Sequence, residues 1–198
     1  MRQREIQNIM IFFPKMNGLE DVLFEIETEF PEEEYSLEKL EKKFCSFCKM
    51  DMTEEEGMKL LVKAAVELTT QEAPKWETIA ARLHMYSFLR KLEDTMQFYK
   101  IDSFYKKLLF LTEQGLYGAY ILEHYTKEEI DSLETILKPE RNKLFQYSGL
   151  ELLLNRYVIR DGKGVILENP QEMFLGIAMH LAMEERTDRL LWVQRFYD

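Results

Sequence analysis

The sequence has little glycine and little proline: 8 and 5 of 198 residues. An all-β sandwich or barrel needs a turn every few residues, and those turns draw on these two residue types. Hydrophobic residues make up 46% and aromatic residues 13% of the chain, which is enough to fill a core and excludes a disordered protein. The composition therefore predicts a helical globular protein.

Cysteine is also scarce. The two cysteines stand in one Cys45-Ser46-Phe47-Cys48 motif and do not make a disulfide framework. A zinc site needs four ligands, but no second cysteine pair exists, and the three histidines are scattered singly. We expect no metal site, and a small redox or metal protein that uses Cys45 and Cys48 is the third of three functional hypotheses.

Basic residues are fewer than acidic ones: the chain has 26 Lys and Arg but 36 Asp and Glu, so its net charge is −10 and its pI is near 5.0. A surface this acidic repels phosphate backbones, so we expect no nucleic-acid partner. No apolar run approaches the 18 or so residues of a membrane span, and the N-terminus lacks the pattern of a signal peptide. We expect a cytoplasmic protein without a membrane partner.

Catalytic signatures are missing as well. Neither glycine-rich phosphate-binding fingerprint can be placed, and no Ser-His-Asp set has a motif around it. The segment 161–164, Asp-Gly-Lys-Gly, reads as the turn of a hairpin. We therefore expect no catalytic residues, and local motifs alone predict a binding or scaffolding domain.

Apolar spacing and capping residues predict a mainly α fold, an orthogonal multi-helix domain with one small β-hairpin and a short N-terminal arm. Residues 1–17 are expected to form this extended arm or an edge strand, and residues 156–168 the hairpin. Thr187 is expected to cap the last helix. The expected helices cover 18–30, 36–49, 53–68, 74–96, 103–114, part of 117–125, 126–137, 150–154, 170–184 and 187–197.

Arg82 follows two alanines in a strongly apolar helix. A guanidinium in such a place needs partners, since an unpaired buried charge is very costly. We expect an internal ion pair with an acid such as Glu77 or Asp94. The alternative role is the orientation of a partner surface.

The order of motifs from about residue 69 onward resembles the N-terminal all-helical domain of the large (α) subunit of class I ribonucleotide reductase. The C-terminal part of this resemblance rests on Phe145, Tyr147, Gly149, Arg156, Tyr157, the string 168–174 and Arg195-Phe196-Tyr197-Asp198. The earlier part rests on Thr70, Ala73-Pro74, Trp76, the string 79–83, Gly115, Tyr117, the string 122–126, Glu128, Glu129 and Arg141. In that family the last string lies just before the catalytic barrel, so the resemblance implies a domain at 69–198 without the barrel.

In the same family a regulatory ATP-cone often precedes this domain, and residues 1–68 resemble a partial or degenerate form of it. By resemblance, Thr53 and Lys91 are candidate nucleotide-binding residues, with ATP or dATP as the ligand. The resemblance is incomplete: no basic Lys-Arg-Asp-Gly hairpin precedes Ile9, and Gly57 stands where a histidine is expected. A triphosphate needs several cationic donors at close range, so we expect weak or absent regulation by adenine nucleotides and no other cofactor in this chain.

The leading hypothesis is an N-terminal domain of a ribonucleoside-diphosphate reductase, an oxidoreductase of deoxyribonucleotide synthesis for DNA replication. The domain would be structural or regulatory and not catalytic by itself. Its implied partners are the catalytic barrel, in cis or in trans, and through the holoenzyme the small subunit. This hypothesis predicts a large apolar surface near the C-terminus, especially on the helix that spans 173–183. The second hypothesis, a free-standing helical interaction or regulatory protein derived from that domain, predicts no such patch.

Overall fold

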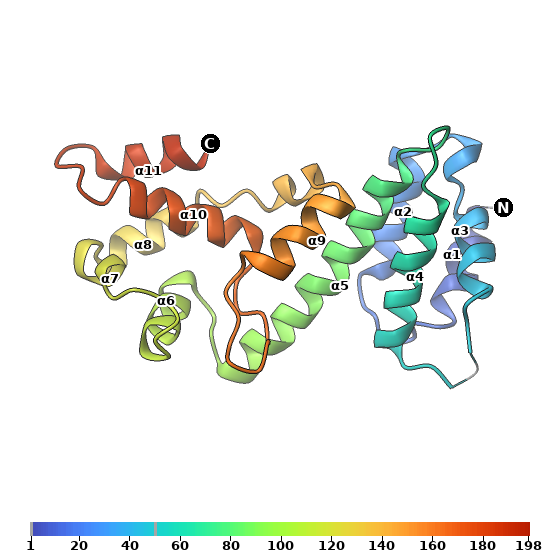
Figure 1. The fold of residues 1–198 in the computed structure, drawn as a ribbon, viewed down its shortest axis with the longest axis horizontal. Helices are drawn as coiled ribbons and strands as arrows, with labels where there is room; N and C mark the ends of the chain where they lie inside the picture. The colour runs from blue at the N-terminus through green and yellow to red at the C-terminus, as the bar shows by residue number, and fades with distance from the viewer. Residues whose placement is uncertain (1, 50) are drawn as a thin grey trace. The chain divides into compact units, whose positions relative to one another are not determined.

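The computed structural model describes residues 2–49 and 51–198, and the side chains from Glu5 onward. This part of the chain is mainly helical, as predicted (Figure 1). The α-helices are α1 Arg2–Met10, α2 Leu19–Glu29, α3 Leu37–Cys45, α4 Glu54–Leu68, α5 Trp76–Tyr99, α6 Phe104–Glu113, α7 Tyr120–His124, α8 Lys127–Glu134, α9 Tyr147–Arg156, α10 Pro170–Leu181 and α11 Arg189–Tyr197. Two 3₁₀ helices, η1 Glu33–Tyr35 and η2 Pro139–Leu144, complete the described elements. None of the described helices is both long and apolar enough to cross a lipid bilayer.

The chain forms two compact units. The first unit contains residues 1–88 and 143–151, and the second contains 89–142 and 152–198, so that α5 and α9 contribute residues to both. The expected domains at 1–68 and 69–198 were defined by family resemblance, whereas the two units are defined by packing. The expected division stays a prediction.

The core of the first unit is built where α1, α2, α3 and α4 pack together (Figure 1). Phe13 and Phe44 are fully buried there, with their rings stacked at a centroid distance of 5.7 Å. Trp76 is also buried, and its indole nitrogen donates to the carbonyl of Glu34 at 3.0 Å, which satisfies the one polar atom of the ring.

The core of the second unit lies between α6, α8, α10 and α11. Leu175, Met179 and Val193 are fully buried within it. Tyr125 is buried beside them, and its hydroxyl donates to the carbonyl of Met179 at 2.7 Å.

Three helix starts were predicted from capping residues and are confirmed as capping boxes. Thr53, Thr126 and Asn169 each accept a hydrogen bond from the backbone nitrogen three residues later, and a glutamate at that position returns one. Each such box satisfies two backbone donors that a helix start otherwise leaves free. The expected cap at Thr187 is wrong: Asp188, with a φ of 54°, precedes α11 and makes no side-chain cap bond.

The expected N-terminal arm or edge strand is also wrong, because residues 2–10 form α1. The apolar run Ile9–Phe13 suggested an extended segment, but Ile6, Ile9 and Phe13 are the residues that become buried. Their spacing of three and four places them on one helical face and its continuation.

The expected hairpin at 156–168 is reduced to a single antiparallel bridge between Arg160 and Ile166, and the described residues contain no strand. The carboxylate of Asp161 forms the turn by accepting from the backbone nitrogens of Lys163 and Val165, each at 2.8 Å. The ladder does not continue because Ile159 N donates to the side chain of Glu168 at 3.3 Å rather than to a facing carbonyl.

Arg82 forms the expected internal ion pair, but with a different acid. Its guanidinium donates to both carboxylate oxygens of Glu29, at 2.8 and 3.0 Å. Glu77, one of the two expected partners, instead accepts from the Ser148 hydroxyl at 2.6 Å. Glu29 lies 53 residues away in the sequence, at the end of α2, and only the tertiary fold brings it to Arg82.

Candidate interaction surface

Thr53, the first nucleotide-binding candidate, is engaged within its own helix start. Its hydroxyl accepts from Glu56 N at 3.2 Å and donates to the Glu56 carboxylate at 3.0 Å. That carboxylate also accepts from Thr53 N at 2.8 Å, and the contact lowers the pKa of Glu56. Glutamates of this chain therefore compete with a phosphate group at the positive end of α4.

The next turn of α4 is closed by an aromatic ring. Gly57 is buried, and a Cβ atom at this position would lie 2.8 Å from a ring carbon of Phe13. The position where the family resemblance expects a histidine thus has no room for any side chain. Nucleotide binding at Thr53 stays a prediction.

This close approach predicts the effect of alanine at Gly57. Alanine normally stabilises a helix by roughly 0.5–1 kcal/mol over glycine. At Gly57 the new methyl group collides with Phe13, so we expect Gly57→Ala to lower the free energy of unfolding by about 1–3 kcal/mol, measured by urea denaturation. The matched control is Gly149→Ala on α9, where a Cβ atom would meet nothing within 4 Å. A stabilisation by Gly57→Ala similar to that by Gly149→Ala would contradict the filled position.

Lys91, the second candidate, is an exposed residue of α5, and its carbonyl accepts from Thr95 Oγ1 at 2.8 Å. Thr53 belongs to the first compact unit and Lys91 to the second. The fold of neither unit joins the two residues into one site.

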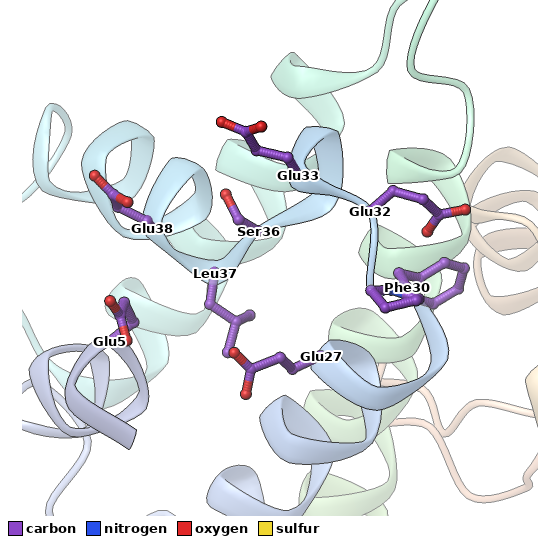
Figure 2. A pocket seen from close by; sticks show the side chains of 9 residues that line it. Glu5, Glu27, Phe30, Glu32, Glu33, Ser36, Leu37 and Glu38 are labelled. Atoms are coloured by element: carbon purple, nitrogen blue, oxygen red, sulfur yellow. The ribbon is translucent and has the colours of Figure 1, made fainter. Parts of the chain in front are cut away.

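An acidic cavity of about 190 Å³ lies in the first unit, bordered by α1, α2 and the segment that leads into α3. Phe30 and Leu37 line it together with five glutamates, Glu5, Glu27, Glu32, Glu33 and Glu38 (Figure 2). The labelled carboxylates point in different directions, and no described group of His, Cys, Asp or Glu could hold a metal ion. Two of the glutamates are engaged by lysines, Glu38 by Lys42 and Glu32 by Lys75.

A buried polar cluster in the second unit holds the start of α10. Lys107 of α6 donates to both carboxylate oxygens of Glu172, at 2.6 and 2.7 Å, and its side chain is only 6% exposed. Glu172 also accepts from Asn169 N at 2.9 Å in the capping box. Because Lys107 is charged and buried, this ion pair ties α6 firmly to the first turn of α10.

Glu168 lies in the same cluster. Its pKa is raised to about 7: burial and the neighbouring Glu172 carboxylate raise it, whereas the bond from Ile159 N and the charge of Lys107 lower it. Tyr117 is close as well: the charge of Glu168 adds to the burial that raises the pKa of Tyr117. The Tyr117 hydroxyl lies against Gly176, where a Cβ atom would approach it to 2.4 Å. The cluster therefore fixes α10 along its first two turns.

The C-terminal residues are joined to α10 and η2. The Tyr197 hydroxyl donates to Gln171 Oε1 at 2.8 Å and accepts from Lys138 N at 2.9 Å. Arg141 donates to Tyr197 O at 3.0 Å and to the Asp198 carboxylate at 2.8 Å. Tyr197 and Asp198, the last two residues of the Arg-Phe-Tyr-Asp string, therefore hold the end of α11 against α10 and η2.

The outward face of α10 is apolar. Phe174, Ile177 and Leu181 are 38%, 50% and 59% exposed, and their spacing of three and four places them on one side of the helix. The opposite side, with Leu175, Ala178 and Met179, is buried. This stripe, which we call the α10 stripe, is a candidate interaction surface because exposed apolar side chains on one helix face mark a place where another surface packs.

The α10 stripe was predicted from the sequence, and the structure bears out an exposed apolar face in the segment 173–183. The polar cluster beneath it was not predicted. The position of Glu172 could have been predicted, because it is the third residue after the capping residue Asn169. The burial of Lys107 could not, because a Lys106-Lys107 pair is typical of a solvated helix face.

The geometry defines a helical scaffolding domain with a rigidly mounted apolar helix face, and comparisons with known proteins specify the family. Residues 143–198 match the family described as the ribonucleotide reductase all-alpha domain. The chain is 54% identical over 176 residues to the ribonucleoside-diphosphate reductase subunit alpha of Treponema pallidum (strain Nichols), a match that covers 89% of this chain and 21% of that subunit.

Two more distant relatives agree. The corresponding subunit of Enterobacteria phage T4 is 33% identical over 154 residues, 77% of this chain and 20% of that subunit. Subunit alpha of ribonucleoside-diphosphate reductase 1 of Escherichia coli (strain K12) is 29% identical over 140 residues, 70% of this chain and 18% of that subunit. The chain thus spans about a fifth of the length of these relatives. It belongs to the ribonucleotide reductase large-subunit family, within its N-terminal all-α domain.

Proposed function

We propose that this chain serves as the N-terminal domain of a ribonucleoside-diphosphate reductase large subunit and docks, through the α10 stripe, on the catalytic barrel of that subunit. The barrel would lie in the same polypeptide or in a separate one. The observation that carries the proposal is the exposure of Phe174, Ile177 and Leu181 on a helix whose other face is fixed by Lys107, Tyr117 and Tyr125. The domain would act by packing and positioning, and the small subunit would be met only through the holoenzyme.

The length of the relatives supports the proposal that the barrel covers the α10 stripe. About four fifths of each relative lies outside the matched region, so a large remainder of the subunit is available to cover an apolar helix face. The stripe also lies inside the segment that matches the all-alpha domain, residues 143–198. An apolar face that is solvent-exposed in the isolated domain and covered in the subunit is typical of a domain that packs within a larger protein.

Regulation by ATP or dATP is not included in the proposed function. The hydroxyl of Thr53 is held by Glu56, and Phe13 fills the space at Gly57. We infer that residues 1–68 are a reduced form of the cone-like region that packs α1 to α4 into a core and does not bind a triphosphate.

The test is assembly in trans. The 198-residue chain is mixed with the separately produced remainder of the large subunit from the same source, and binding is measured by size-exclusion chromatography and titration calorimetry. We expect the chain to bind, and we expect Ile177→Asp to weaken binding by at least about thirtyfold, since a central apolar contact contributes about 2 kcal/mol or more. The control is Phe24→Asp, an exposed apolar residue of α2 in the first unit, which should bind like the unchanged chain.

Equal binding by the Ile177→Asp variant would refute the α10 stripe as the docking surface. If the unchanged chain does not bind at all and remains a stable monomer or dimer, the free-standing interaction protein becomes the better hypothesis.

A further inference from the structure

Cys45 and Cys48 form a thiol pair that the proposed function does not use. Cys45 is the last residue of α3 and is exposed, and Cys48 is half-buried in the turn that follows. Cys48 Sγ donates to the carbonyl of Phe44, the residue before Cys45, at 3.3 Å. The Cys48 thiol is therefore directed back toward the end of α3, where Cys45 lies.

The backbone between the two cysteines suits a disulfide. Cys48 N donates to Cys45 O at 3.3 Å, and the intervening Ser46 has φ −66° and ψ −16°, so the four residues form a tight turn. A turn of this kind holds the Cα atoms of its first and fourth residues less than about 7 Å apart. A disulfide joins Cα atoms about 4.4–6.8 Å apart, so closure needs little movement of the backbone.

We infer that Cys45 and Cys48 are a reversible dithiol–disulfide site that locks the turn after α3 under oxidising conditions, with low-molecular-weight disulfides such as glutathione disulfide as the oxidant. The thiolate of the exposed Cys45 attacks the oxidant, forms a mixed disulfide and releases one glutathione thiolate. Cys48 then loses its proton, and its sulfur attacks the Cys45 sulfur and displaces the second glutathione. Two protein thiols are oxidised by two electrons, and one glutathione disulfide is reduced to two glutathione molecules.

The surroundings of the pair favour slow structural oxidation rather than fast redox catalysis. Burial, and then the charge of Glu41, raise the pKa of Cys45, and burial and the neighbouring Cys45 raise the pKa of Cys48. Both sulfurs lie at the C-terminal end of α3, where the helix dipole disfavours a thiolate. Closure should therefore accelerate as the pH rises, because the thiolate is the attacking form.

The consequence concerns Phe47, which stands between the two cysteines. The ammonium groups of Lys43 and Lys63 lie over its ring, at 5.3 and 4.7 Å from the ring centroid. Since Lys63 belongs to α4, the turn is one of the places where α3 and α4 meet. A disulfide would hold this turn, and with it the aromatic contact to α4, in the conformation seen here.

The test treats the reduced 198-residue chain with glutathione disulfide, followed by acid quenching, alkylation and intact-mass measurement. We expect a product lighter by two hydrogen atoms, in more than about tenfold excess over any glutathione adduct, because the second thiol attacks within the same turn. Cys45→Ser and Cys48→Ser, each with one thiol left, should instead stop at a single glutathione adduct. In the oxidised chain, amide hydrogen exchange of Phe47 and Cys48 should slow relative to the reduced chain.

Accumulation of glutathione adducts on the unchanged chain, or of disulfide-linked dimers, would overturn the inference. The result on the unchanged chain decides the question even if a serine variant folds poorly. Both outcomes are independent of docking on the barrel, so the failure of one proposal does not imply the failure of the other.

Discussion

Glu168→Gln is expected to raise the free energy of unfolding by about 3 kcal/mol at about pH 8, and to leave it nearly unchanged at about pH 4. Glu168 is only 4% exposed, and burial raises its pKa from 4.5 to about 7. Ionisation in the folded protein is therefore unfavourable. Glutamine removes the charge and keeps an oxygen that can accept from Ile159 N.

The sign follows from proton binding in the two states. Below about pH 4.5 Glu168 is protonated in both the folded and the unfolded chain, so it does not affect stability. Between about 4.5 and 7 the unfolded chain releases the proton while the folded chain keeps it, and stability falls as the pH rises. Above about pH 7 the unchanged chain has lost the full amount of unfolding free energy, and the glutamine variant does not lose it.

Urea denaturation at several pH values measures this effect. Trp192 lies in the second unit and Trp76 in the first, so fluorescence contains a reporter in each compact unit. The matched control is Glu185→Gln, an exposed carboxylate of the second unit, which should change stability by no more than about 0.5 kcal/mol at any pH. A destabilisation by Glu168→Gln at pH 8 would show that the ionised carboxylate stabilises the fold, contrary to this account.

Helix starts could be predicted from the sequence where the deciding hydrogen bonds join residues close together in the chain. The starts of α4, α8 and α10 were predicted because Thr53, Thr126 and Asn169 are capping residues, and the capping bonds span only three residues. The exposed face of α10 was expected on other grounds, because the family resemblance implied a surface for a partner on residues 173–183. Only the capping predictions use interactions within one helix.

Predictions failed where a contact outside the local pattern decides. The segment 156–168 has a hairpin sequence, but the Glu168 carboxylate takes the Ile159 backbone nitrogen that a strand pair would use. Thr53 was placed correctly as a helix cap. The approach of Phe13 to Gly57, from 44 residues away, carries no local signal. Arg82 needed an acid, and the sequence offered nearer ones than Glu29.

The polar cluster beneath α10 holds the helix that carries the α10 stripe. Lys107, Glu168, Glu172 and Tyr117 come from α6, from the segment after α9, from α10 and from the loop before α7. The buried charges of Lys107 and Glu172 stabilise each other, and Glu168 packs beside them as an acid whose pKa is raised to about 7. We infer that this fixed arrangement, rather than the apolar residues themselves, sets the direction in which the α10 stripe faces.

Lys107→Met is accordingly expected to cost about 3–5 kcal/mol of folding free energy at about pH 8. The substitution keeps the apolar stem of the side chain but leaves the buried carboxylate of Glu172 without its cation, next to Glu168. The loss should be smaller at about pH 5, where Glu168, whose pKa is raised to about 7, is protonated and does not repel the Glu172 carboxylate. Urea denaturation at the two pH values measures both effects.

The neighbouring lysine provides the control. Lys106 on the same helix pairs with Asp102 at 2.7 Å, but both side chains are more than half exposed, at 51% and 70%. Lys106→Met should therefore cost less than about 1 kcal/mol. The difference between two adjacent lysines would isolate the effect of burial, because charge, helix and substitution are the same. If the two variants are equally stable, Lys107 does not anchor α10, and the docking face must be held by its apolar contacts alone.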